Sequence, residues 1–117
     1  MSYIDGFVIP VRDDRKDEYR AHALKAAAVF KRHGAERVVE CWGDDVPDGK
    51  TTDFKRAVAA QAGETVVFAW IVWPSKAVRD AASRAVMEDP ALRPGPDLPF
   101  DGKRLIYGGF EPVVDVG

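Results

Sequence analysis

The sequence predicts an α+β domain of the ferredoxin-like type, with the element order βαββαβ. Segments rich in aromatic and β-branched residues alternate with two alanine-rich segments of helical period, and glycine and proline clusters separate them. The 117 residues, 46% of them hydrophobic, are enough for a single domain over residues 1–117 with its own core. Right-handed crossovers then place both helices on one face of an antiparallel sheet.

The first two elements are an edge strand and a long amphipathic helix. Residues 3–11 are expected to form the strand, and Pro10 places it at a sheet edge or marks its end, because proline donates no backbone hydrogen bond. Residues 13–33 are expected to form the helix, with one of the two aspartates at its start as the cap and Gly34 as the terminator. Its apolar stripe consists of Tyr19, Ala23, Ala26, Ala27 and Phe30.

The remaining elements follow from the same signals. They are expected at residues 36–43 (strand), 54–60 (a short strand), 65–73 (strand), 75–89 (helix) and 103–114 (containing the last strand). Ser75 is the expected cap of the second helix. The proline-rich segment 90–102 is expected to be a loop with at most one helical turn. Gly108 and Gly109 indicate a bulge or a close approach in the last strand.

Strand 65–73 is apolar on both of its faces. One face carries Val66, Phe68, Trp70 and Val72, and the other carries Val67, Ala69, Ile71 and Trp73. Two helices cover only one face of a four-stranded sheet, so a second apolar layer must cover the other face. The simplest partner is a second copy of the chain, which gives a homodimeric α+β barrel with the sheets face to face. We expect Phe68 or Trp70 in this interface.

Composition and charge exclude several classes of protein. The net charge of −2 offers no basic surface for nucleic acid, and residues 104–110 do not fit the aromatic motif of RNA-recognition strands. The N-terminus has no basic region followed by an apolar stretch, and the longest apolar segment, 66–73, is far shorter than the ~20 residues of a membrane helix. One cysteine forms no internal disulfide. We therefore expect a cytoplasmic protein that contacts neither nucleic acid nor a membrane.

Five stretches carry a resemblance to a known family. They are YIDGF (3–7), VVECWGDDVPDGK (38–50), TDF (52–54), PSKAVRD (74–80) and PFDGKRLIYGGF (99–110). Together they resemble the YbaA-like family of small uncharacterised bacterial proteins, nearly end to end. The resemblance implies the fold of the dimeric α+β barrels, which include cofactor-poor monooxygenases, haem-degrading enzymes, cyclases and ligand-binding regulators. It implies no catalytic residue and no cofactor.

The acidic segment 44–53 does not have the pattern of a metal site. A calcium loop that begins at Asp44 would place Val46 and Lys55 at two positions that need oxygen ligands. A solvated turn is therefore expected, and no metal. His22 and His33 lie eleven residues apart on one helix, roughly 16 Å, so they cannot share a metal ion. Cys41 has no base beside it in the sequence and is expected to be buried and inert.

The candidate ligand pocket consists of Glu40, Trp42 and Tyr107. Glu40 and Trp42 share one face of their strand, and an acid on a buried face is costly unless it is paired or wetted. Aromatic walls beside one polar group are typical of small-molecule pockets, so we place this one between the helix-free face and the partner sheet. The alternative for Glu40 is a salt bridge with an arginine, or a strand face that points at the helices.

The expected function is the binding of a small apolar or aromatic molecule, with or without cofactor-poor catalysis. A convincing enzyme would show two titratable groups converging on one cavity. The alternative function is a non-catalytic interaction or regulatory protein whose barrel is filled by side chains. Residue patterns alone do not separate these classes.

Overall fold

A computed structural model describes residues 1–92 and 98–117, and its elements follow the expected order. The strands are β1 (Tyr3–Arg12), β2 (Arg37–Trp42), β3 (Glu64–Trp73) and β4 (Ile106–Phe110). The helices are α1 (Lys16–Arg32), α2 (Phe54–Ala57) and α3 (Lys76–Glu88), with short 3₁₀ turns at Asp13–Arg15 and Pro90–Leu92. The loop expected over 90–102 begins with that second turn, and its residues 93–97 lie outside the described part of the chain.

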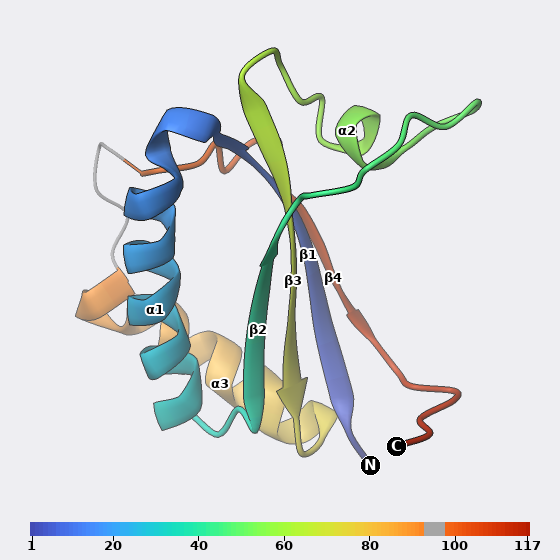
Figure 1. Ribbon diagram of the computed structural model, residues 1–117. Helices are drawn as coiled ribbons and strands as arrows, with labels where there is room; N and C mark the ends of the chain where they lie inside the picture. The colour runs from blue at the N-terminus through green and yellow to red at the C-terminus, as the bar shows by residue number, and fades with distance from the viewer. Residues whose placement is uncertain (93–97) are drawn as a thin grey trace.

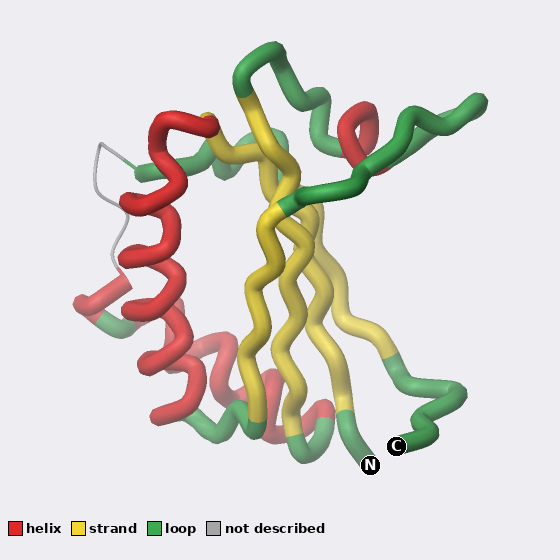
Figure 2. The backbone as a smooth tube through the Cα atoms, viewed as in Figure 1, coloured by secondary structure: helices red, strands yellow, loops and turns green. Residues whose placement is uncertain are grey.

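The four strands form one antiparallel sheet in the order β2-β3-β1-β4. Helices α1 and α3 lie against one face, while α2 and the C-terminal segment lie on the opposite side (Figures 1 and 2). This is the ferredoxin-like arrangement, and the predicted fold class is confirmed.

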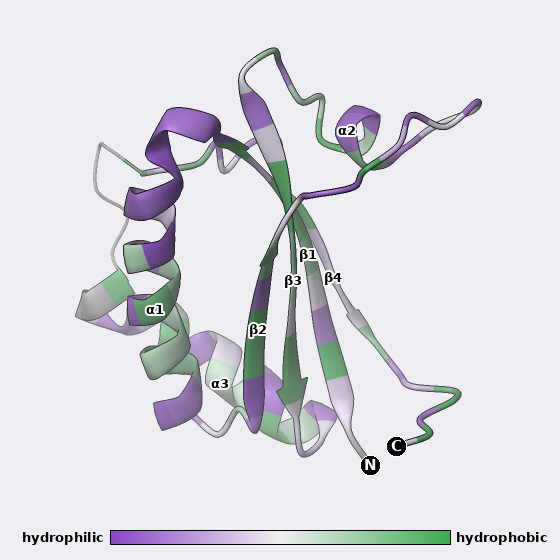
Figure 3. Ribbon diagram, viewed as in Figure 1, coloured by the Kyte–Doolittle hydropathy of each residue, from purple (hydrophilic) through white to green (hydrophobic). Residues whose placement is uncertain are grey.

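The core lies between the sheet and the two long helices. Figure 3 shows hydrophobic residues along the strands and a hydrophilic start of α1. The buried side chains on the helix side of the sheet include Ile9, Val11, Val67, Ala69, Ile71 and Trp73, with Tyr19, Ala23 and Ala82 from the helices. Strand parity then leaves Phe68 and Trp70 on the helix-free face.

One buried ion pair fixes α3 against the sheet. Asp5, at 7% exposure, accepts a hydrogen bond from Arg79 Nη2 at 2.8 Å and another from Trp73 Nε1 at 2.9 Å. The Arg79 guanidinium also lies 5.2 Å from the centre of the Tyr3 ring. A Cβ atom on Gly109 would overlap the Tyr3 hydroxyl, so the close approach expected at the glycine pair is real. The bulge expected there is absent, because the β1–β4 register passes through both glycines unbroken.

Pro10 lies in an inner strand and not at an edge. Strand β1 continues to Arg12 between β3 and β4. Strand β4 pairs only with Ile4–Val8, however, so β1 has a single neighbour at Pro10. A residue without an N–H is tolerated there for the same reason that proline is tolerated at an edge.

Two local predictions are wrong for reasons of hydrogen bonding. The short strand expected at 54–60 is the helix α2, because the Asp53 side chain accepts the Arg56 N–H at 2.8 Å and caps a helical turn. Neither Asp13 nor Asp14 caps α1: Asp13 accepts a hydrogen bond from Thr65, and Asp14 pairs with Arg12. Gly34 ends α1 with a φ of 110°, as predicted.

Candidate functional site

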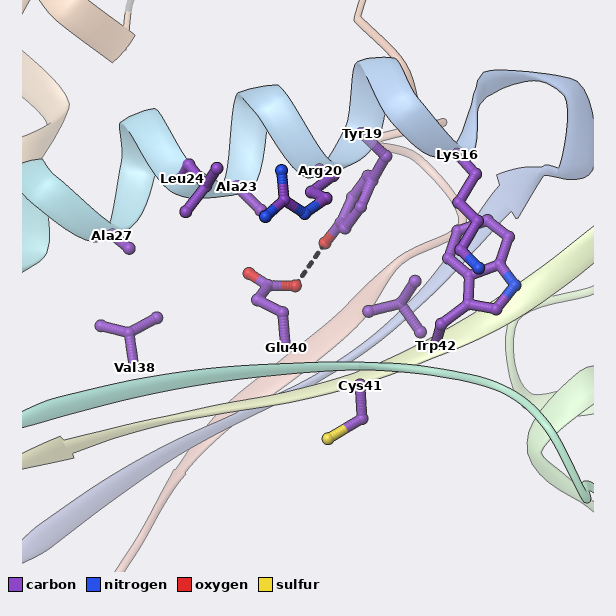
Figure 4. A pocket seen from close by; sticks show the side chains of 11 residues that line it. Lys16, Tyr19, Arg20, Ala23, Leu24, Ala27, Val38, Glu40, Cys41 and Trp42 are labelled. Carbon is purple, nitrogen blue, oxygen red and sulfur yellow. Dashed lines mark hydrogen bonds between the residues drawn. The ribbon is translucent and has the colours of Figure 1, made fainter.

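A pocket of about 330 Å³ lies between helix α1 and strand β2 (Figure 4). Its lining residues are Lys16, Tyr19, Arg20, Ala23, Leu24 and Ala27 from α1, Val38, Glu40, Cys41 and Trp42 from β2, and Val67 from β3. Figure 4 shows the Cys41 side chain on the side of β2 that faces away from α1, so its thiol does not point into the pocket. Alanine, leucine, valine and tryptophan side chains form the apolar part of the lining, and Lys16, Arg20 and Glu40 bring charge to it.

The secondary structure explains why this space is hollow. Tyr19, Ala23 and Ala27 follow one another at four-residue spacing and therefore share one face of α1. Val38, Glu40 and Trp42 alternate along β2 and share the helix-facing side of the sheet. The two alanines extend only to Cβ, so the helix leaves a gap above the strand next to the Tyr19 ring.

The Tyr19 hydroxyl donates a 2.6 Å hydrogen bond to Glu40 Oε1 within this pocket. Glu40 is an exposed residue, but neighbouring protein atoms partly desolvate its carboxylate, and this desolvation raises the pKa of Glu40. The Tyr19 hydrogen bond acts in the opposite direction and lowers that pKa. Burial and the neighbouring carboxylate raise the pKa of Tyr19, so its hydroxyl keeps its proton.

Two exposed cationic side chains line the pocket. Lys16 Nζ lies 5.2 Å from the centre of the Trp42 ring, in a cation–π contact. Arg20 reaches from α1 over the pocket on the same side as Glu40 (Figure 4). Within the described part of the chain Arg20 forms no ion pair, and Glu40 has none either. Two cations and one carboxylate therefore line the pocket, and the carboxylate has a neutral partner, Tyr19.

A second cavity of about 410 Å³ lies between α1, α3, the sheet and the segment that leads into β4. Tyr19, Ala23 and Glu40 line both spaces, so the tyrosine–glutamate pair lies between the two. His22 also lines the second cavity, and the centre of its ring lies 5.4 Å from that of Phe100. Desolvation, with a smaller contribution from Lys25, lowers the pKa of His22, which favours its neutral form.

Glu40 and Trp42 lie together in the outer pocket, but on the opposite face from the one expected. They pair with Ala69 and Val67 on the helix side of β3, so their placement on the helix-free face is wrong, and the alternative, a strand face that points at the helices, is the one observed. The alternation within β2 is as predicted; the register with β3 decides which face it presents. Glu40 does not form the salt bridge weighed as an alternative, since its partner is Tyr19.

Tyr107 does not join this pocket. It lies on the edge strand β4, 73% exposed, and its ring stacks on Phe7 with the ring centres 6.1 Å apart. The expected trio is thus reduced to Glu40 and Trp42.

Phe68 and Trp70 lie on the helix-free face, where the sequence placed the dimer interface. Their ring centres are 5.7 Å apart, and Phe68 is 46% exposed. An apolar groove of about 560 Å³ runs over this face. Its other lining residues include Ile4, Val8, Ile106, Gly108, Phe110 and Val114. Cys41 lies on the same face by strand parity and is exposed, so its expected burial is wrong.

The acidic segment 44–53 forms a projecting loop held by its own side chains. Asp53 accepts hydrogen bonds from Gly49 N and Arg56 N, and Asp48 pairs with Lys55 at 3.3 Å. In residues 1–92 and 98–117, no three acidic, histidine or cysteine side chains are grouped so that they could hold a metal ion. In the same residues, no helix is long and apolar enough to cross a membrane.

Sequence reasoning missed Tyr19, Lys16 and Arg20 as site residues. Tyr19 was assigned to the apolar stripe of α1, which is correct but omits its hydroxyl. A buried tyrosine needs a hydrogen-bond partner, and this requirement is a signal that could have linked it to Glu40, an acid on the helix-facing side of β2. Lys16 and Arg20 carry no such signal, since exposed cations are common on helices.

Comparisons with known proteins give the following likenesses. A family profile described as "Protein of unknown function (DUF1428)" matches residues 2–102. Relatives named "Uncharacterized protein YbaA", from Escherichia coli (strain K12) and from Shigella flexneri, are 59% identical over 116 residues, which is 98% of this chain and 99% of each relative. The solved structure "Structure of Rv0793 from Mycobacterium tuberculosis" covers 100% of both chains with a TM-score of 0.49 and 12% identity.

Proposed function

This chain belongs to the DUF1428 family, as its resemblance to the YbaA-like proteins predicted, and we propose that it binds a small molecule with an apolar or aromatic body in the pocket between α1 and β2. The observation that carries the proposal is the Tyr19–Glu40 pair in a pocket that is also lined by apolar side chains and by two cations, Lys16 and Arg20. Apolar walls with a few polar groups that fix orientation are the usual composition of a ligand site. Trp42 supplies a flat aromatic wall at one end (Figure 4).

The partial desolvation of an acid supports this proposal over simple packing. A desolvated carboxylate costs free energy, and a hydroxyl partner compensates for only part of that cost. An apolar side chain at position 40 would pack against α1 without this cost. A ligand that contacts the carboxylate would explain why the protein keeps an acid here despite its desolvation free energy. Acids with perturbed pKa values cluster at binding and catalytic sites for this reason.

A pair of matched helix variants tests the location of the site. Calorimetric titration with phenylpyruvate, 2-naphthoate and 2-naphthol is expected to show binding to the wild-type protein. Ala27→Phe fills the pocket and should abolish this binding, whereas Ala21→Phe adds the same ring on the exposed side of the same helix and should not. Binding that persists unchanged in Ala27→Phe would contradict the proposed site.

Tryptophan fluorescence gives an independent readout at the other wall. Ligands that enter the pocket should quench Trp42, and the quenching should be lost in Trp42→Leu while the oligomeric state is unchanged. The same quenching in Trp42→Leu as in the wild type would assign the signal to Trp70 or Trp73 and contradict the site.

We also propose that the working unit is a cytoplasmic homodimer joined through the helix-free face. Phe68, Ile106 and Phe110 expose 45–60% of their surface on one side of the sheet, which is an unusual loss of apolar burial for a monomer. A second copy would cover this face by a two-fold axis and give two sheets around one interior. The single cysteine supports a reducing compartment.

The helix-free groove also supports a second candidate function. A regulatory or interaction protein would have a barrel filled by side chains, or would use this apolar face for a different chain, and would bind no small molecule in the α1–β2 pocket. The same titrations separate the two, because an interaction protein binds none of the three aromatic probes.

A further inference from the structure

We propose that Glu40 is a general base that moves a proton within a bound organic anion, and that the substrate class is an aryl-substituted 2-oxo acid with an enolisable carbonyl group. This inference rests on the proposed function of the same pocket and adds the substrate class and the reaction. It follows from three features of the site: a carboxylate oxygen without a hydrogen-bond partner among the described residues, two cations in the lining, and aromatic and apolar walls.

The geometry leaves one oxygen of Glu40 available. Oε1 accepts the Tyr19 hydroxyl at 2.6 Å, which fixes the orientation of the carboxylate. The other oxygen is turned away from Tyr19 into the hollow (Figure 4), and among the described residues it has no hydrogen-bond partner. A general base must reach a ligand proton directly, so this oxygen is the group placed to accept it.

The charges that line the pocket select the ligand. Lys16 and Arg20 line the same pocket as Glu40, and these two cations outnumber its one carboxylate, so the pocket favours an anionic ligand over an amine. An organic acid would pair its carboxylate with these cations and place its apolar part against Ala23, Ala27 and Val38. Trp42 offers a flat surface for an aromatic substituent.

The pKa shifts of Glu40 and Tyr19 also fit a proton acceptor and a hydrogen-bond donor, respectively. Burial raises the pKa of Glu40, which makes it a stronger proton acceptor than a solvated glutamate. Tyr19 keeps its proton because its own pKa is raised, so it remains a donor that holds the carboxylate in place. Tyr19 is therefore a positioning residue, and Glu40 is the catalytic residue.

The reaction needs no oxidant or second substrate. Glu40 takes a proton from the carbon next to the carbonyl group, the C–H electron pair becomes the new C=C bond, and the carbonyl π pair moves to oxygen. Return of the proton to that oxygen gives the enol, and its return to carbon regenerates the keto form. The net change is a tautomerisation, and Lys16 and Arg20 stabilise the negative charge of the enolate.

Proton exchange of phenylpyruvate in D₂O tests the proposal with the full-length protein. The wild type should accelerate the loss of the methylene signal in the proton NMR spectrum above the buffer rate. Glu40→Gln should lower the enzymatic rate by at least about 100-fold, the usual contribution of a general base, while calorimetry still shows binding. Glu36→Gln, an exposed acid just before β2, is the matched control and should leave the rate unchanged.

Two further variants are expected to change the pH dependence of exchange or the affinity for phenylpyruvate. Neither quantity would change if Tyr19 and Arg20 only stabilised the fold. Because the Tyr19 hydrogen bond lowers the pKa of Glu40, Tyr19→Phe should shift the rise of the exchange rate with pH to higher pH. Arg20→Gln should weaken phenylpyruvate binding by about tenfold, the loss of one charge-assisted contact.

The outcomes separate this inference from the proposed function. Binding of phenylpyruvate without accelerated exchange would overturn the general base and leave the ligand site standing. Exchange that persists in Glu40→Gln would overturn the assignment of the base. Absence of binding by all three aromatic probes would overturn both.

Discussion

Glu40 is the residue on which the functional interpretation depends, and its ionisation should be visible in the stability of the fold. Desolvation raises its pKa above the value of 4.5 expected in the unfolded chain, so the folded state holds the proton more tightly. The resulting stabilisation is fully present below pH 4.5 and is lost as the pH rises through the folded-state pKa.

Denaturation curves over a range of pH test this residue directly. The unfolding free energy of the wild type, relative to Glu40→Gln, should fall as the pH rises above 4.5. Glu36→Gln provides the comparison for the loss of one exposed carboxylate. Parallel pH profiles for the wild type and Glu40→Gln would mean that the folded protein does not perturb this acid.

At the scale of the element, the hydroxyl of Ser75 fixes the N-terminal end of helix α3. Ser75 Oγ accepts the Val78 N–H at 3.2 Å, as the sequence predicted for this cap. Ser75→Ala should therefore lower the unfolding free energy by about 1 kcal/mol.

Ser83 provides a matched control on the same helix. It is exposed and donates its hydroxyl hydrogen bond to the Arg79 carbonyl within the helix, an interaction that adds little to helix stability. Ser83→Ala should be neutral or slightly stabilising in the same urea titration. Equal losses in both variants would contradict the role of Ser75 as a cap.

The elements also show where sequence reasoning succeeds and where it stops. The hydrophobic period and the positions of glycine and proline predicted both long helices and the order of the four main strands along the chain. Strand alternation predicted that Glu40 and Cys41 point to opposite faces of β2. The face that Glu40 presents depends on which β3 residue it meets, and this long-range register has no local signal. The short helix α2 was misassigned because its cap, Asp53, was counted among the residues of a solvated turn.

At the scale of the whole molecule, the sheet has one covered face and one open apolar face. Since Phe68 is already 46% exposed in the single chain, Phe68→Asp should change the monomer's own packing little and disrupt the proposed dimer strongly. Sedimentation of the wild type at micromolar concentration should give twice the chain mass of 12.9 kDa.

The Phe68→Asp variant should sediment as the 12.9 kDa monomer. Ala77→Asp, an exposed position on α3 and on the opposite side of the sheet, should remain dimeric. A wild-type protein that sediments as a monomer would contradict the dimer, but it would not affect the α1–β2 pocket, which one chain forms by itself.

Amide chemical-shift mapping tests the ligand site most directly, because it reports which face of the sheet a small molecule contacts. Titration of ¹⁵N-labelled protein with phenylpyruvate should perturb amides of residues 16–27 on α1 and 38–42 on β2. Shifts confined to residues 4–8 of β1 and to β4, on the helix-free groove, would contradict the site between α1 and β2.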